Sequence, residues 1–155
     1  MSSSDRSPLM AALGGLAAGA AGTGTMTVAQ TVYSKATGGG SSSTPAQVGK
    51  RIIEGVLKRE VPEERMEQLN NVMHWAYGTS WGALYGIAAG SRRPSPLRGG
   101  LLFALGVWGA SLVELPAMGL APPVWEYEPK DLAPDLGFHL VYGVAVATAF
   151  KIIER

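Results

Sequence analysis

Charged residues are missing from four long stretches of the chain, and this pattern predicts the fold. The charge-poor windows are 7–34, 68–91, 99–125 and 136–150, and Glu114 is the one charged residue within them. A surface helix of a soluble domain needs polar residues along its wet face. A run of about 20 apolar residues instead crosses the hydrocarbon layer of a membrane. We therefore expect an all-α, four-span transmembrane helical bundle that forms a single membrane domain over residues 1–155, with spans at about 8–33, 68–90, 99–120 and 133–153.

The segment between the first two spans has the pattern of an amphipathic helix at about 45–60. Thr44 and Pro45 suit the N-cap and the first position of a helix, and Gln47 completes a capping box. The apolar face holds Val48, Ile52, Ile53, Val56 and Leu57. A helix of this length does not cross the membrane, so we expect it to lie at the membrane interface or to fold over the end of the bundle.

Composition excludes several classes of function. The chain has 13 basic and 12 acidic residues, a net charge of +1, so bulk charge does not favour nucleic acid as a partner. It has no Cys, which excludes disulfides, iron–sulfur clusters and thiol catalysis. The sequence contains no G-x-S-x-G, Walker A, H-E-x-x-H or dinucleotide-binding motif. The prediction therefore leans against an enzyme, and the expected partner is the lipid bilayer.

Small side chains dominate the first predicted span. Gly15 and Gly19 form a G-x-x-x-G pair, a spacing that lets a neighbouring helix backbone approach closely. This face predicts a homo-oligomer or a contact with another membrane protein. The alternative is that Arg6 and the following Ala-rich run form a cleaved secretory signal.

A short motif occurs twice in the chain. H-x-x-Y-G is found at residues 74–78 and again at 139–143, and an amide or carboxylate residue, Asn70 or Asp135, lies four positions before each histidine. The two histidines of the motif are the only histidines of the chain. A weaker match relates the first span to the third. We therefore expect two repeated helix pairs, related by an axis along the membrane normal because each copy has an even number of spans.

This topology predicts a polar layer at one end of the bundle. The first and third spans end on the side where the second and fourth begin. Gln30 and Glu114 lie near the ends of their spans, and His74 and His139 lie near the starts of theirs. Residues three or four apart share a helix face, so the layer extends to their neighbours. The candidate site is His74, His139, Glu114, Gln30, Tyr77, Tyr142 and Asp135.

Three interpretations of the polar layer stay open. An intramembrane carboxylate finds a partner or becomes protonated, so we expect Glu114 to meet one of the histidines. Such polar contacts can serve only to fix helix packing. The layer can instead bind protons or a small ligand, because histidine titrates near neutral pH. His74 and His139, at one depth on separate helices, could also ligate a haem axially, and no stronger metal-ligand spacing is present.

The third span and its exit carry a family resemblance. The run from Glu114 to Trp125, E-L-P-A-M-G-L-A-P-P-V-W, is followed by D-L-G-F-H-L-V-Y at 135–142. Together these segments resemble the YagU-like family of small bacterial inner-membrane proteins, and the resemblance covers roughly residues 70–145. It implies a multi-span protein of the bacterial inner membrane and no established activity.

The loop after the second predicted span sets the expected orientation. Residues 91–98, S-R-R-P-S-P-L-R, concentrate three arginines beside two span ends, whereas acidic residues dilute the basic residues of the longer connecting segment on the opposite side. Positive charge in short loops favours the cytoplasmic side. We therefore expect both termini to be cytoplasmic.

Overall fold

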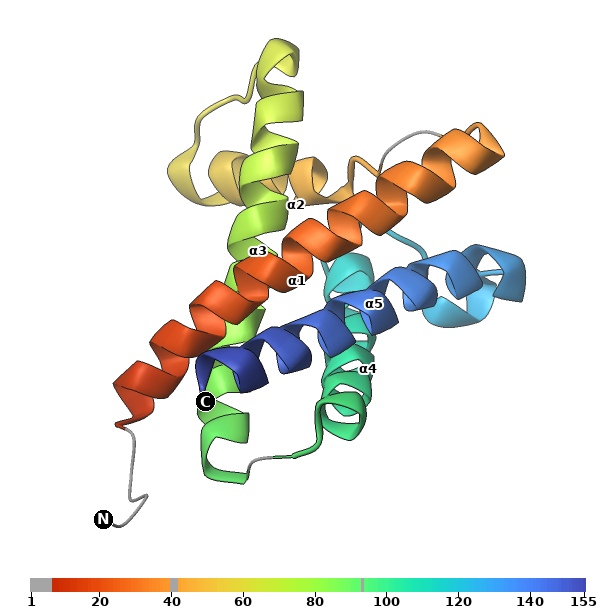
Figure 1. Ribbon diagram of the computed structural model, residues 1–155. Coiled ribbons are helices and arrows are strands. Elements are labelled where there is room, and N and C mark those ends of the chain that lie inside the picture. Colours follow the sequence, from red (N-terminus) through yellow and green to blue (C-terminus); the bar gives the residue numbers. More distant parts are fainter. Residues whose placement is uncertain (1–6, 40–41, 93) are drawn as a thin grey trace.

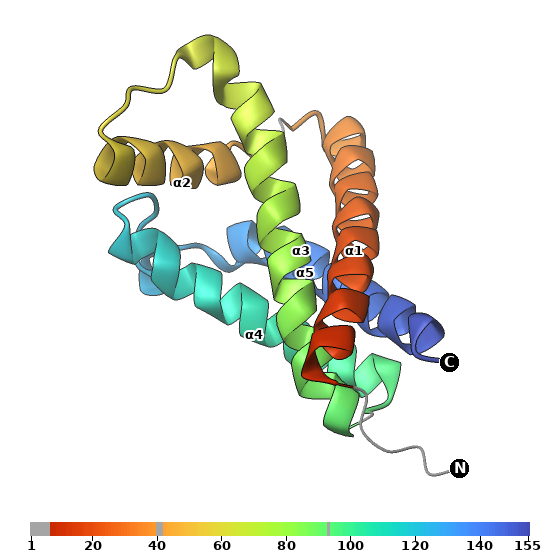
Figure 2. The ribbon, with the colours of Figure 1, turned by 90° about the vertical axis from the view of Figure 1, so that its left-hand side faces the viewer.

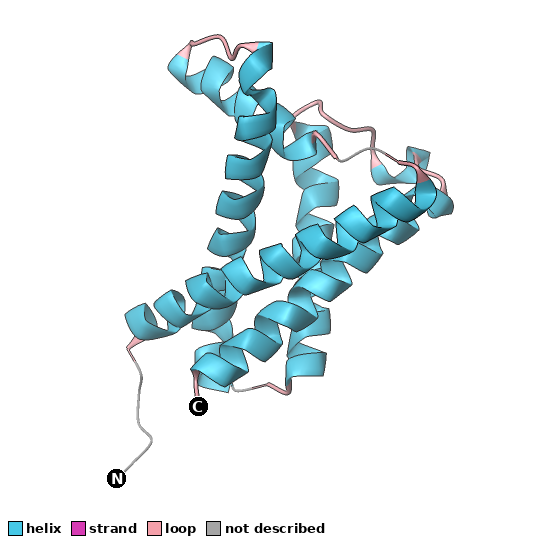
Figure 3. Cartoon of the chain, turned by 45° about the horizontal axis from the view of Figure 1, so that its top comes forward, coloured by secondary structure: helices cyan, strands magenta, loops and turns pink. Residues whose placement is uncertain are grey.

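The computed structural model describes residues 7–39, 42–92 and 94–155, and over these ranges it contains helices and loops and no strand (Figure 1 and Figure 3). The prediction of an all-α fold is confirmed. The long helices are α1 (Pro8–Thr37), α2 (Thr44–Ile52), α3 (Met66–Arg92), α4 (Pro96–Ala117) and α5 (Pro129–Ile153). The short turns are η1 (Ile53–Leu57), η2 (Glu63–Arg65) and η3 (Val124–Glu126).

Within the described residues, three helices are long and apolar enough to cross a membrane, namely α1, α4 and α5. Helix α3 is long enough, but its first half carries Glu67, Asn70, Asn71 and His74, and it falls outside this group. Large apolar side chains are exposed along the three apolar helices, for example Leu13 on α1 and Leu102 on α4. Exposed apolar surface on this scale is typical of a membrane protein rather than a soluble monomer.

The C-terminal end of α4 differs from the prediction. The third span was expected to continue to about residue 120, but the helix ends at Ala117. Gly119 adopts a left-handed conformation with φ of 68°, and its amide donates to the Pro116 carbonyl. The amide of Leu120 donates to the Leu115 carbonyl, which closes the helix end. A glycine in this conformation is a common helix terminator, and it acts here before the two prolines that follow.

Helix α1 lies between α3 and α5, and α4 packs on α5 (Figure 1 and Figure 2). The contact between α1 and α3 is made by glycine. A Cβ atom on Gly19 would lie 2.9 Å from the Cα of Gly82 and 2.9 Å from the carbonyl oxygen of Gly78. A Cβ atom on Gly15 would lie 3.0 Å from the Cα of Gly86. The G-x-x-x-G face of α1 is therefore covered within the chain, which removes the reason to expect that this face forms an oligomer.

Glycine also brings α4 and α5 together. A Cβ atom on Gly100 would lie 2.7 Å from the Gly143 carbonyl oxygen, and one on Gly143 would lie 2.7 Å from Ala104 Cβ. Gly22 of α1 lies against Tyr142 and Val146 of α5. Gly22 is therefore out of phase with Gly15 and Gly19 because it contacts a different helix.

Helix α2 is shorter than predicted, and it packs with a different face. Its N-cap is Ser43, one residue before the predicted Thr44, and Gln47 Nε2 donates to Ser43 Oγ. The α-helical part gives way to the π-helical turn η1, which Lys58 ends in a left-handed conformation. The small residues Ala46 and Gly49 pack on α3, so α2 lies across the start of that helix (Figure 2).

Candidate functional site

The polar layer is built at the end of the bundle where α1 and α4 end and α3 and α5 begin (Figure 1). Four hydrogen-bonded contacts between helices hold it together. They link α1 to α3, α3 to α4, α4 to α5 and α3 to α5.

His74 of α3 contacts α1. Its Nε2 atom lies 3.2 Å from Thr27 Oγ1. The Thr27 hydroxyl donates its own proton to the Thr23 carbonyl at 2.9 Å, so the hydroxyl oxygen is the acceptor and His74 Nε2 carries the proton. Sequence reasoning missed Thr27. The sequence did contain a signal for this residue. Thr23, Thr27 and Thr31 are four residues apart, so they form one polar face on the part of α1 that also carries Gln30.

Tyr77 connects α3 to α4. Its hydroxyl donates to Glu114 Oε2 at 2.9 Å. The expectation that Glu114 would bond to a histidine is therefore wrong. Tyr77 lies one turn further along α3 than His74, and its hydroxyl is the group that contacts the carboxylate. The side chains of both Tyr77 and Glu114 are partly accessible, which leaves the second carboxylate oxygen open to a ligand or to water.

Asp135 connects α5 to α4. Its Oδ2 atom accepts a hydrogen bond of 2.9 Å from Trp108 Nε1. His139 Nδ1 lies 2.8 Å from the backbone oxygen of Asp135 and 3.6 Å from its Oδ1 atom, so Nδ1 carries a proton. Within the described residues the Nε2 atom of this ring has no hydrogen-bond partner. Trp108 was not predicted. The sequence could have indicated it, because the indole N–H of a tryptophan in an apolar span needs a hydrogen-bond acceptor.

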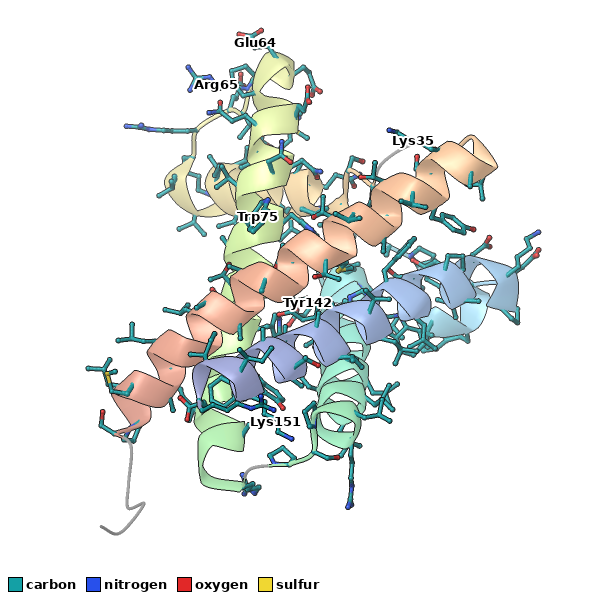
Figure 4. All side chains as sticks on the ribbon, viewed as in Figure 1. Lys35, Glu64, Arg65, Trp75, Tyr142 and Lys151 are labelled. Carbon is teal, nitrogen blue, oxygen red and sulfur yellow. The ribbon has the colours of Figure 1, made fainter. Side chains whose placement is uncertain are left out.

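Tyr142 joins the two copies of the H-x-x-Y-G motif. Its hydroxyl donates to the Gly78 carbonyl of the other copy at 2.6 Å, and the side chain is buried in the interior of the bundle (Figure 4). Gly78 can accept this bond at short range because α3 has no side chain there.

Two polar residues of the predicted layer have other positions. Gln30 is half-buried near the end of α1, and within the part of the chain that the structure describes it makes no hydrogen bond to another site residue. Asn70, the counterpart of Asp135 in the repeated motif, faces α2 instead of α4. Its Oδ1 atom accepts from the Ala46 amide at 3.0 Å, and its Nδ2 atom donates to the Ser42 carbonyl.

Aromatic rings close the bundle below the polar layer. Trp81 lies 6.0 Å from Tyr77 and 6.3 Å from Phe103, measured between ring centroids. Phe103 also contacts Tyr85 at 4.9 Å and Tyr142 at 5.7 Å. Trp81, Tyr85 and Phe103 lie further from the polar end of the bundle than the groups above. These three rings, together with Tyr142, form a packed aromatic layer that joins α3, α4 and α5 beneath the polar layer, and we call Trp81, Tyr85 and Phe103 the aromatic floor.

No family model, no curated protein and no solved structure matches this chain. Among residues 7–39, 42–92 and 94–155, no three His, Asp or Glu side chains are grouped closely enough to hold a metal ion. The layer does contain two imidazoles, two carboxylates and two phenols, held in four separate hydrogen-bonded groups between neighbouring helices. Groups of this kind exchange protons and bind small polar ligands.

Proposed function

We propose that this protein is a four-span integral membrane protein whose polar layer binds protons or a small polar ligand from one side of the membrane. The main support for the proposal is that the polar layer lies at one end of the bundle, directly against the aromatic floor. Polar groups from α1, α3, α4 and α5 gather at one end, and packed rings separate them from the other end. A one-sided arrangement favours binding over conduction through the bundle.

Helix α3 is the proposed fourth span. It packs along α1 through Gly78, Gly82 and Gly86, so it shares the depth of a helix that is apolar enough to cross. Close packing of glycine backbones is a usual way to hold helices together in lipid, where the hydrophobic effect between helices is absent. Three polar residues of its first half have partners on neighbouring helices, His74 on α1, Asn70 on α2 and Tyr77 on α4.

The proposed location is the bacterial inner membrane, with both termini cytoplasmic. The YagU-like resemblance and the arginine-rich loop at 91–98 support it, although Arg6 and Arg93 lie outside the described residues. Arg92 and Arg98 flank the turn between α3 and α4 and suit the cytoplasmic side. The test attaches a reporter to each terminus and measures its protease accessibility in spheroplasts. We expect both reporters to be protected, and cleavage of both would reverse the orientation.

The test of the binding proposal uses the fluorescence of Trp108. A variant with Trp75, Trp81 and Trp125 replaced by Phe keeps only the indole that is bonded to Asp135 beside His139. We expect its emission in nanodiscs to depend on pH and this dependence to change in His139→Gln, which removes the ionisable ring beside the indole. Ser80→Ala, a change on an exposed position of α3, serves as the control.

The alternative in which the layer only fixes packing predicts a different result. His74→Gln and His139→Gln would then lower the melting temperature and leave the pH titration of Trp108 unchanged. A shifted titration at an unchanged melting temperature supports the binding proposal. An unshifted titration together with a loss of stability contradicts it.

Axial ligation of a haem by His74 and His139 is a second proposal. The placement of the two histidines on α3 and α5, which Tyr142 joins through the Gly78 carbonyl, favours it, and within the described residues no hydrogen bond occupies the Nε2 atom of His139. Against it, His74 would have to give up the bond of its Nε2 atom to Thr27. Absence of a Soret band from protein purified after expression with ample haem would rule the haem out.

A homo-oligomer or a membrane-protein partner is proposed on a face other than that of α1. Gly106 and Gly109 of α4 have open space around them, and Leu102 and Val113 beside them are exposed. Cysteine crosslinking at position 106 in native membranes that gave only monomer would contradict a contact through this face.

A further inference from the structure

The apolar face of the α2 and η1 segment is left uncovered. Ala46 and Gly49 make the contact with α3, where a Cβ atom on Gly49 would lie 2.7 Å from Met73 Cγ. On the other side of the segment, Ile52, Val56 and Leu57 are 45%, 73% and 61% exposed. These three residues form the uncovered face. The segment therefore packs on the bundle with its small residues and turns its large apolar residues outward.

Two cations follow the uncovered face directly. Lys58 has a left-handed backbone with φ of 52°, which ends η1 and turns the chain. Lys58 and Arg59 are both exposed beside Leu57. Together with Lys50 they line a shallow cavity of about 550 Å³, whose remaining lining residues are Glu54, Glu60 and Val61.

The nearby carboxylates are largely engaged in other contacts. Glu54 Oε1 accepts a hydrogen bond from the Val61 amide, and Glu63 accepts one of 3.0 Å from Lys50. The hydrogen bond to Glu63 raises the pKa of Lys50, so its ammonium group stays charged at all physiological pH values. Lys58 and Arg59 are then the cations that remain for an external anion, and the two carboxylates that line the same cavity with them are Glu54 and Glu60.

We propose that the α2 and η1 segment docks on the phospholipid surface, with Ile52, Val56 and Leu57 inserted beneath the headgroups and Lys58 and Arg59 on lipid phosphates. An apolar face edged by cations is complementary to this layer, which is apolar below and anionic at its surface. The proposal rests on the membrane location proposed above. Anionic lipids should strengthen docking, because each basic residue near an anionic surface contributes to the attraction.

Docking would act on the polar layer through Arg51. Its Nε and Nη2 atoms donate to the Met118 carbonyl at 3.1 and 2.7 Å, at the C-terminal end of α4. Glu114 lies one turn earlier on the same helix, and its carbonyl accepts from the Met118 amide. The docked segment therefore fixes the end of α4 that carries the carboxylate bonded to Tyr77.

The test uses single cysteines, which the Cys-free sequence allows without background. Val56→Cys reports the uncovered face, and Gln47→Cys reports an exposed position of α2 outside it. Leu105→Cys, on the exposed surface of α4, reports membrane insertion itself. The full chain is placed in nanodiscs of phosphatidylcholine, with or without phosphatidylglycerol, and the labelling rate by a membrane-impermeant maleimide is measured.

We expect the thiol of Val56→Cys to react at least about tenfold more slowly than that of Gln47→Cys when phosphatidylglycerol is present, because a buried cationic-edged face excludes the reagent. Val56 is open in the protein itself, so protection at this position must come from lipid. Adding Lys58→Gln or Arg59→Gln to Val56→Cys should raise its labelling rate about fivefold, the effect of one lost charge at an anionic surface. Arg65→Gln, a surface cation outside the face, should leave the rate unchanged.

Each of the other outcomes contradicts a separate part of the proposal. If the thiol at position 105 is protected while those at positions 56 and 47 react equally fast, docking is wrong and membrane insertion stands. If the thiol at position 105 is labelled as well, the membrane location fails. Protection at position 56 that ignores both lipid charge and the two glutamine changes overturns the phosphate contact. Protection by dissolved glycerol phosphate in phosphatidylcholine nanodiscs alone would assign the cations to a free phosphate instead of a lipid.

Discussion

The close contact between α1 and α3 gives the sharpest prediction of stability, for Gly82→Ala. The added methyl group would lie 2.5 Å from the Gly15 carbonyl oxygen and 2.7 Å from the Gly19 amide nitrogen, and it would also contact the Gly19 Cα. These are backbone atoms, which cannot move aside as the end of a side chain can. Forcing an extra carbon into such a contact costs about 1–3 kcal/mol.

Gly137→Ala, on α5, is the matched control for this change. No heavy atom lies within 4 Å of the position that its Cβ would occupy, so the same substitution there meets no obstacle. Replacing glycine by alanine in an open helix position stabilises by about 1 kcal/mol. This gain is common to both helix positions, so the two variants should differ by the cost of the close contact, about 1–3 kcal/mol in unfolding free energy. For a chain of this size the gap corresponds to a difference of about 2–12 °C in melting temperature.

The assay is equilibrium unfolding by SDS in mixed micelles, followed by far-ultraviolet circular dichroism, with thermal melts as a second measure. Equal stability of Gly82→Ala and Gly137→Ala would refute glycine packing between α1 and α3. A loss of stability in Gly82→Ala that depended on protein concentration would show that the glycine face joins two chains instead.

Three further changes test the polar layer and its support. Tyr77→Phe removes the bond to Glu114 and should lower the unfolding free energy by about 1 kcal/mol in the same SDS titration, because the contact is partly exposed; an unchanged midpoint would contradict the bond. Trp108→Phe should lower the unfolding free energy by about 1–3 kcal/mol in the same titration, since the Asp135 carboxylate loses its donor; an unchanged midpoint would count against this bond. Arg51→Gln should speed proteolysis in the loop after α4, and an unaltered cleavage rate would mean that the Met118 contact does not hold that end.

The charge pattern was enough to predict the helices, but not how they pair. The windows without charge fixed where α1, α4 and α5 lie, because only an apolar run tolerates lipid. The G-x-x-x-G at Gly15 and Gly19 predicted a close helix contact without identifying its partner. The sequence did hold a clue to the partner helix, because Gly78, Gly82, Gly86 and Gly90 recur every four residues along α3 and form a second small face. Two matching small faces in one chain favour an internal contact over an oligomer.

The side-chain partners of the polar layer were harder to predict than its depth. Chain direction alone places His74, His139 and Glu114 at one end, because helices of similar length alternate in direction. Whether Glu114 meets a histidine or Tyr77 depends on the rotation of α4 about its own axis, which is set by Gly100 packing on Gly143. Periodicity fixes the depth of a residue to within a turn, whereas rotation depends on tertiary contacts.

The two H-x-x-Y-G segments differ in a way that bears on function. Their glycines have the same role, which is to let a neighbouring helix pack closely. Gly78 lies against α1 at Thr23, and Gly143 lies against α4 at Gly100. Their polar members do not, because Tyr77 bonds to a carboxylate and Tyr142 bonds to a backbone carbonyl.

The histidines differ in the same way: His74 donates from Nε2 to another helix, whereas His139 donates from Nδ1 to its own. A motif retained only for packing needs its glycine and leaves its polar positions interchangeable. Here the two histidines hold opposite ring nitrogens in hydrogen bonds, so each would take up a proton at a different nitrogen. The double change Thr27→Val with His74→Phe should therefore remove the contact between α1 and α3 and leave the bond of His139 to its own helix in place, so the emission maximum of Trp108 should not move. A shifted emission maximum of Trp108 would mean that the two rings act as one unit.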